Sequence, residues 1–128
     1  MYRIDEVHYG FKLLFSGCIT ADEMVQWLRE SRRLLQDVRA PFGVLVDMRE
    51  LDPMSAEVRV YFEEGQRLYK QRGMRRSAVI LRGSHMTRQF RRLARETGVN
   101  VWERYIDANQ KEDFESRGEI WITHGIEP

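Results

Sequence analysis

The stretch Phe42-Gly43-Val44-Leu45-Val46-Asp47 decides the fold that this sequence predicts. An unbroken apolar run that ends in an acid is typical of a strand buried on both faces of a sheet. Ser55 follows eight residues later and is a good N-cap for the long helical pattern behind it. Sheets built from such strands bind ligands at the carboxyl ends of the strands, so the residues after Asp47 mark a candidate functional edge.

The segments on either side of this strand alternate between strand and helix patterns. Alternating runs at 2–7 and 11–17 predict an N-terminal hairpin. Thr20 and Glu23 match a capping box, and the helix it starts keeps an apolar stripe as far as Val38 before Pro41 stops it. The other expected elements are a helix from Ser55 to a C-cap at Gly73, a strand at 77–81, a helix at 86–97, a strand at 99–106 and a last helix capped by Asp107 or Asn109.

This order of elements predicts an α/β fold with a mostly parallel mixed sheet. We expect about five strands with an N-terminal antiparallel hairpin, and about four helices on both faces of the sheet. A chain of 128 residues without a repeat or linker favours one domain. No apolar run approaches the roughly 18 residues of a membrane span, no signal peptide is visible, and the single cysteine, Cys18, has no partner for a disulfide. These features favour a cytosolic protein.

The charge of the chain is unevenly distributed although its net value is only +1. The segment 65–95 contains ten basic residues and no acid, so the rest of the chain carries 11 basic and 20 acidic residues, a net charge of −9. Seven arginines of this segment are candidates for one basic surface on the side of the third helix: Arg72, Arg75, Arg76, Arg88, Arg91, Arg92 and Arg95. Such a surface attracts phosphates and carboxylates. The alternative is a solvated face partly neutralised by Glu57, Glu63 and Glu64 of the neighbouring helix.

Aromatic and methionine side chains recur along the second and third helices. The candidate ligand-binding residues are Tyr61, Phe62, Gly65, Tyr69, Met86 and Phe90. Methionine adapts to irregular ligand shapes, and Gly65 would leave room for a cleft in the middle of the stripe. Ordinary core packing explains most of the same residues, so both interpretations stand at this point.

Few residues offer catalytic chemistry. Asp47 is expected mainly to accept backbone N–H groups of the next loop, and Ser55 to cap its helix, with phosphorylation of Ser55 as the alternative. Cys18 has no His or acid placed beside it by the sequence, so a small buried thiol is favoured over a nucleophile. His8, His85 and His124 lack metal-ligand spacing. The sequence therefore predicts no catalytic residue, no metal site and no cofactor.

Several of these segments together resemble the STAS superfamily, and most closely its SpoIIAA-like group. The resemblance rests on FSG-x-IT at 15–20, FGVLVD at 42–47, RSAVIL at 76–81 and WERYID at 102–107, followed by a helix that ends in Trp121-Ile122. In the anti-sigma-factor antagonists of this superfamily, a phosphorylatable serine lies in an Asp-Ser-Ser-Gly type motif at the start of the helix after the central strand. This chain has Asp52-Pro53-Met54-Ser55-Ala56-Glu57 there and keeps one serine of that motif.

The resemblance implies a non-enzymatic bacterial module. SpoIIAA-like members outside the anti-sigma pathway look like small-ligand carriers or interaction modules, which implies an apolar or anionic small ligand or a lipid beside the second and third helices, on one face of the sheet. The alternative is a regulatory domain that binds an acidic protein partner and is switched at Ser55. Nucleic acid is disfavoured as a partner, whereas peripheral contact with a membrane and a homodimer are both compatible with the sequence.

Overall fold

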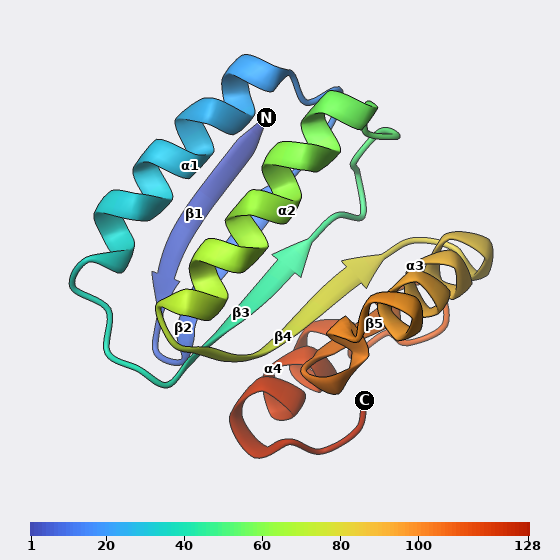
Figure 1. The fold of residues 1–128 in the computed structure, drawn as a ribbon. Coiled ribbons are helices and arrows are strands. Elements are labelled where there is room, and N and C mark those ends of the chain that lie inside the picture. Colours follow the sequence, from blue (N-terminus) through green and yellow to red (C-terminus); the bar gives the residue numbers. More distant parts are fainter.

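The expected central strand forms β3 (Phe42–Asp47), and all six of its residues are buried. In the computed structural model, which describes residues 1–128, β3 is the middle strand of a five-stranded sheet with the order β1-β2-β3-β4-β5 (Figure 1). The other elements are β1 (Tyr2–Val7), β2 (Gly10–Phe15), α1 (Ala21–Leu35), α2 (Ala56–Gln71), β4 (Met74–Leu81), α3 (Ser84–Thr97), the 3-10 helix η1 (Val99–Val101), β5 (Glu103–Asp107) and α4 (Phe114–His124).

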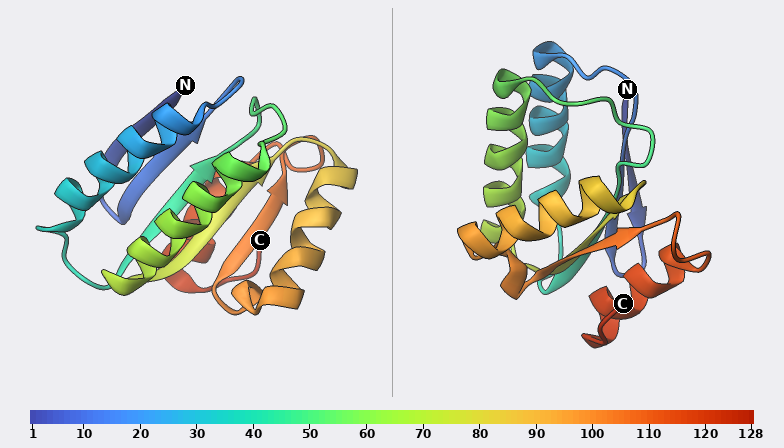
Figure 2. Two further views of the ribbon diagram at one scale, coloured as in Figure 1. Left: turned by 45° about the horizontal axis from the view of Figure 1, so that its top comes forward. Right: turned by 90° about the vertical axis from the view of Figure 1, so that its right-hand side faces the viewer.

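The sheet is mixed, as the sequence predicts. β1 and β2 form the antiparallel hairpin, and the pairs β2–β3, β3–β4 and β4–β5 are all parallel. Helices α1, α2 and α3 cover one face of the sheet and α4 alone covers the other (Figure 2). The larger core cluster lies under the first three helices, and a smaller cluster around Leu45, Ile80 and Trp121 lies under α4. The predicted α/β fold class is therefore confirmed.

Four predicted boundaries were wrong by three residues or more. α1 ends at Leu35, before Val38, and β4 begins at Met74, three residues earlier than expected. Residues 99–101 form a 3-10 helix, and the last strand covers only Glu103–Asp107. The last helix begins at Phe114 because Asp107 remains in β5, where its carboxylate accepts the backbone N–H groups of Gly83 and Asn109.

The three helices on the larger face are not equally packed. α1 and α2 pack side by side, whereas α3 packs against β5 and η1 at the margin of the sheet (Figure 2). Only Thr87 and Ala94 of α3 are buried, and both are small. α3 therefore presents most of its side chains to the solvent.

Candidate functional site

The carboxyl end of β3 is held together by its own side chains. Asp47 accepts the backbone N–H of Arg49 at 3.1 Å, which confirms the predicted structural role, and both of its oxygens also accept from the Arg49 guanidinium, at 3.0 and 2.9 Å. Burial by itself would raise the pKa of Asp47, but the hydrogen bonds from Arg49 outweigh it and the pKa is lowered. Ser55 is exposed, and its hydroxyl accepts the N–H of Val58 at 3.2 Å, which confirms it as the N-cap of α2.

Three of the six candidate ligand-binding residues lie against α1 rather than α3. An added Cβ at Gly65 would overlap the indole ring of Trp27, so the absence of a side chain at this position allows α1 and α2 to pack closely. Phe62 stacks on Trp27 with ring centroids 6.0 Å apart. Tyr69 shares a hydrogen bond of 2.9 Å with Ser31 of α1, and burial raises the pKa of Tyr69 to about 12. Core packing accounts for these three.

Tyr61 also lies toward α1, as the periodicity of α2 shows. It precedes Glu64 by three residues, and Glu64 pairs with Arg32 of α1 at 3.0 Å. The opposite side of α2 is identified by Lys70, whose ammonium lies 4.7 Å from the centroid of the Trp102 ring just after η1. Because Gln66 lies one turn before Lys70, it shares the side of α2 that faces α3.

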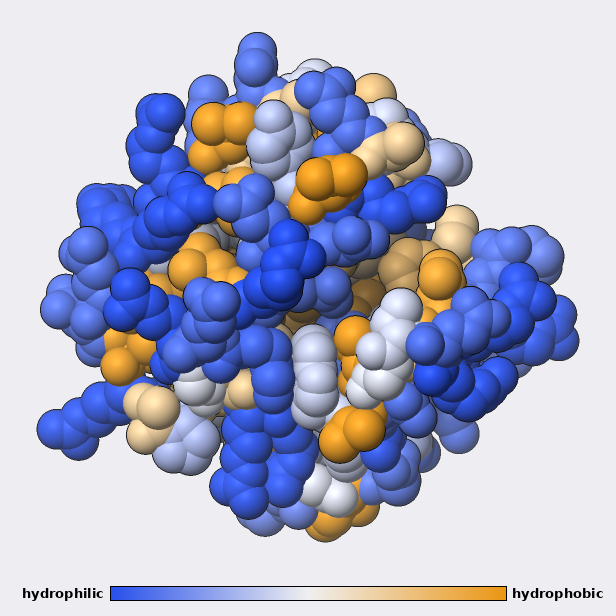
Figure 3. All heavy atoms as spheres, viewed as in Figure 1, coloured by the Kyte–Doolittle hydropathy of each residue, from blue (hydrophilic) through white to orange (hydrophobic).

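A recess separates α2 from α3. Figure 3 shows it as a hollow above the end of β4, with hydrophobic atoms at its base and the hydrophilic surface of α3 at its right-hand rim. Two candidate residues belong to α3: Met86 is 37 % exposed, and Phe90 is half-buried with its ring 5.7 Å from that of Tyr105. The structure thus divides the candidate residues between the α1–α2 interface and α3.

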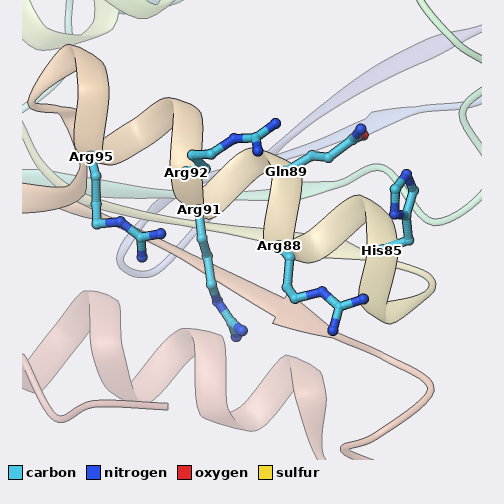
Figure 4. Close-up of a pocket in the computed structure, with 6 residues that line it drawn as sticks. All are labelled: His85, Arg88, Gln89, Arg91, Arg92 and Arg95. Carbon is cyan, nitrogen blue, oxygen red and sulfur yellow. The ribbon is translucent and has the colours of Figure 1, made fainter.

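The arginines of α3 form a basic surface in which none of them pairs with an acidic side chain. Arg88, Arg91, Arg92 and Arg95 are exposed and take part in no ion pair, and with His85 and Gln89 they line an open depression of about 490 Å³ (Figure 4). The alternative, neutralisation by acids of α2, finds no ion pair to support it: Glu64 pairs with Arg32 of α1, and Glu57 and Glu63 take part in none.

The expected membership of Arg76 in this surface was also wrong. Its guanidinium donates to the Ile122 carbonyl at 3.2 Å and lies 5.6 Å from the centroid of the Trp121 ring, on the α4 face of the sheet. Arg72 follows the end of α2, and Arg75 is the exposed residue at which the pairing of β3 and β4 shifts register. Because of this register shift, the Arg76 side chain lies on the α4 face of the sheet and not on the face that α3 covers.

A buried polar cluster under α3 was missed by the sequence interpretation. Glu103 is 3 % exposed; one of its oxygens accepts from Ser77 at 2.8 Å and the other from the Tyr105 hydroxyl at 2.5 Å. Burial raises the pKa of Glu103, although both hydrogen bonds act in the opposite direction. The signal in the sequence was the alternation of Glu103, Tyr105 and Asp107, which places an acid on the face of β5 that packs against α3.

The remaining candidates are dispersed. Cys18 is exposed, so the expectation of a buried thiol was wrong: it lies in the loop between Gly17 and α1, outside the core. The structure brings no three His, Cys, Asp or Glu side chains into a metal-binding arrangement. None of the helices has both the length and the apolar character that crossing a membrane requires.

Comparisons with known proteins agree with the architecture. No family model and no curated protein matches the sequence. The structure is similar to the crystal structure of an uncharacterised protein of the DUF3478 family with a SpoIIAA-like fold, from Shewanella loihica PV-4. The TM-score is 0.64 at 20 % sequence identity, and the match covers 95 % of this chain and 92 % of that one. This protein therefore has a SpoIIAA-like α/β fold.

Proposed function

We propose that this protein is a cytosolic, non-enzymatic STAS-like module that binds a small apolar or amphiphilic molecule, such as a lipid, in the recess between α2 and α3. The observation that carries the proposal is the recess itself, a hydrophobic hollow between two helices that do not pack side by side (Figure 3). It lies above the carboxyl end of β4, and that edge of a parallel sheet is where ligands bind in α/β folds.

The chemistry of the walls suggests how an amphiphile would lie. Met86 and Phe90 on α3 offer apolar surface to a hydrocarbon chain. Arg59 lies eleven residues, or three turns, before Lys70 and so shares the side of α2 that faces α3. Arg59 makes no ion pair, so its guanidinium is available to a carboxylate or phosphate head group.

Ligand binding is tested first on the purified protein. Native mass spectrometry and lipid extraction are expected to find a bound amphiphile, and a palmitate titration is expected to raise the unfolding temperature. A ligand at a hundred times its Kd stabilises the fold by about 2.7 kcal/mol, which such a titration resolves easily. The proposal is excluded if the purified protein contains no bound amphiphile and neither palmitate nor phospholipid monomers raise its unfolding temperature.

The position of the ligand is tested by narrowing the recess. Met86→Trp and Gln66→Trp add a large ring to either wall and are expected to weaken palmitate binding about tenfold or more. Gln26→Trp, an exposed glutamine of α1, is the matched control and should leave the Kd within twofold. Equal affinity in all three variants would place the ligand elsewhere.

A second candidate function is supported by the exposure of Ser55. A phosphate there would add about −1.5 to −2 charge beside the N-terminus of α2. In this alternative the protein is a regulatory domain for an acidic partner, switched at Ser55. If Ser55→Asp and Ser55→Ala bind the partners of the native protein with the same affinity as it does, the switch is ruled out.

A further inference from the structure

β5 is one of the two edge strands of the sheet, the other being β1. It pairs only with β4, and side chains cover its outer edge, so that Glu103, Tyr105 and Asp107 are all buried. The N–H of Ser77 donates to the Trp102 carbonyl at 3.0 Å, and the N–H of Ala108 donates to the Leu81 carbonyl at 2.8 Å. Since parallel pairing alternates along a strand, the backbone groups of residues 103, 105 and 107 point away from β4.

Arginine side chains cover the carbonyls of this edge. Arg91 of α3 donates to the Tyr105 carbonyl at 2.9 Å, and Arg104 donates to the Glu103 carbonyl at 3.1 Å. Charged side chains on an edge strand prevent unspecific pairing with other chains. A carboxylate is a stronger acceptor for a guanidinium than a carbonyl is, and Arg104 already pairs with the Glu127 carboxylate at 2.7 Å.

Two hollows lie along the same edge. One is the depression among the arginines of α3, and the other, of about 380 Å³, lies between α3, β5 and the C-terminal residues Glu127 and Pro128. Both are lined by Arg91 and Arg95, so they adjoin. Arg88, Arg91 and Arg95 project together toward the β5 side of α3 (Figure 4).

We propose that the β5 edge is the docking site for an extended acidic segment of a partner protein, which adds to the sheet as a sixth strand. Its backbone pairs with the outward groups of residues 103 and 105, because the Asp107 carbonyl already accepts the N–H groups of Gln110 and Lys111 at 3.1 and 3.2 Å. Its carboxylates bind Arg88, Arg91 and Arg95. A carboxylate that takes the Arg91 guanidinium releases the Tyr105 carbonyl for the new ladder. A neutral or basic strand cannot make this exchange, which gives the edge its specificity.

The charge distribution selects this occupant over the alternatives. A second copy paired through β5 would bring two arginine-rich α3 helices together, which is unfavourable. Nucleic acid and anionic membranes would satisfy the arginines, but neither offers backbone groups to a strand edge. The inference does not depend on a ligand in the recess between α2 and α3.

The probe is a fluorescein-labelled, terminally blocked peptide of four Glu-Val repeats, and binding is measured by fluorescence anisotropy. A peptide of four Glu-Pro repeats has the same charge and length but lacks every second N–H. We expect the Glu-Val peptide to bind at least tenfold more tightly than the Glu-Pro peptide. We also expect slowed hydrogen exchange at the Tyr105 amide in the complex. Equal binding of the two peptides would overturn the proposal, because charge alone would then explain it.

Charge-reversal variants test where on the protein the Glu-Val peptide binds. Arg88→Glu/Arg95→Glu changes two exposed side chains that make no internal hydrogen bond, and it should weaken Glu-Val binding at least tenfold. Arg29→Glu/Arg33→Glu on α1 has the same effect on net charge and should leave the Kd within twofold. If the charge reversal lowers the urea midpoint of unfolding, the neutral variant Arg88→Gln/Arg95→Gln replaces it in the binding measurement. If the charge reversals on α1 and on α3 weaken Glu-Val binding equally, the docking site is wrong. It is also wrong if single-stranded RNA or anionic vesicles displace the peptide fully without slowing hydrogen exchange at the Tyr105 amide.

Discussion

At the scale of single residues, the contact between Gly65 and Trp27 sets the distance between α1 and α2. Gly65→Ala would ordinarily stabilise a helix by up to about 1 kcal/mol. Here the new methyl group overlaps the indole, so we expect a loss of about 1–3 kcal/mol in the free energy of unfolding, measured with urea. The double variant Trp27→Leu/Gly65→Ala should show a smaller alanine penalty than the single variant. An equal penalty in both backgrounds would mean that another contact is responsible.

Glu103 is a second position at which one residue has a measurable effect, here on the pH dependence of the free energy of unfolding. Because burial raises its pKa above the ordinary 4.5, the folded protein holds this proton more tightly than the unfolded chain does. The resulting stabilisation is complete below pH 4.5 and is lost as the pH rises toward the folded pKa. Within that window the loss is up to about 1.4 kcal/mol per pH unit.

Glu103→Gln removes this titration while keeping the shape of the side chain. We expect the variant to gain stability over the native protein as the pH is raised from 5 to 8, measured by urea unfolding at several pH values. Glu96→Gln, at an exposed glutamate of α3, is the control and should show no such trend. A constant difference between Glu103→Gln and the native protein across this range would contradict the assignment.

At the scale of elements, the two N-caps define where α1 and α2 begin. Ser55→Ala removes the acceptor for the Val58 N–H and should cost about 1 kcal/mol. Ser55→Asp keeps an acceptor and adds a negative charge at the helix N-terminus, so its stability should stay within about 0.5 kcal/mol of the native value or exceed it. Thermal unfolding of the three proteins checks the order. If Ser55→Ala is as stable as Ser55→Asp, the cap contributes nothing to stability.

At the scale of the whole molecule, one helix protects an entire face of the sheet. Trp121 of α4 is buried against this face, its indole N–H donates to the Ser77 carbonyl at 3.0 Å, and the Arg104 guanidinium lies 4.0 Å from its ring centroid. Trp121→Ala should cost about 3–5 kcal/mol in urea unfolding. It should also expose the cluster around Leu45 and Ile80 to a hydrophobic dye. Ile120→Ala, at an exposed position of the same helix, is the control and should cost less than about 1 kcal/mol.

Much of the fold follows from local patterns. The buried run of β3, the capping box at Thr20 and the cap at Ser55 are each encoded within a few residues, and each was confirmed. The candidate site was harder to predict because a helical stripe does not reveal which neighbour it faces. Gly65 and Tyr69 fit a pocket and a helix interface equally well until the rotation of α2 is known.

The sequence by itself determined the order of strands and helices and the concentration of arginine between Gly65 and Arg95, because periodicity and charge are properties of neighbouring residues. Only the tertiary structure decided which arginines share a surface. A register shift beside Arg75 sends Arg76 to the α4 face, and the packing of α3 on β5 brings Arg91 to the Tyr105 carbonyl. Both outcomes depend on strand register and helix rotation, which long-range packing sets and no local pattern contains.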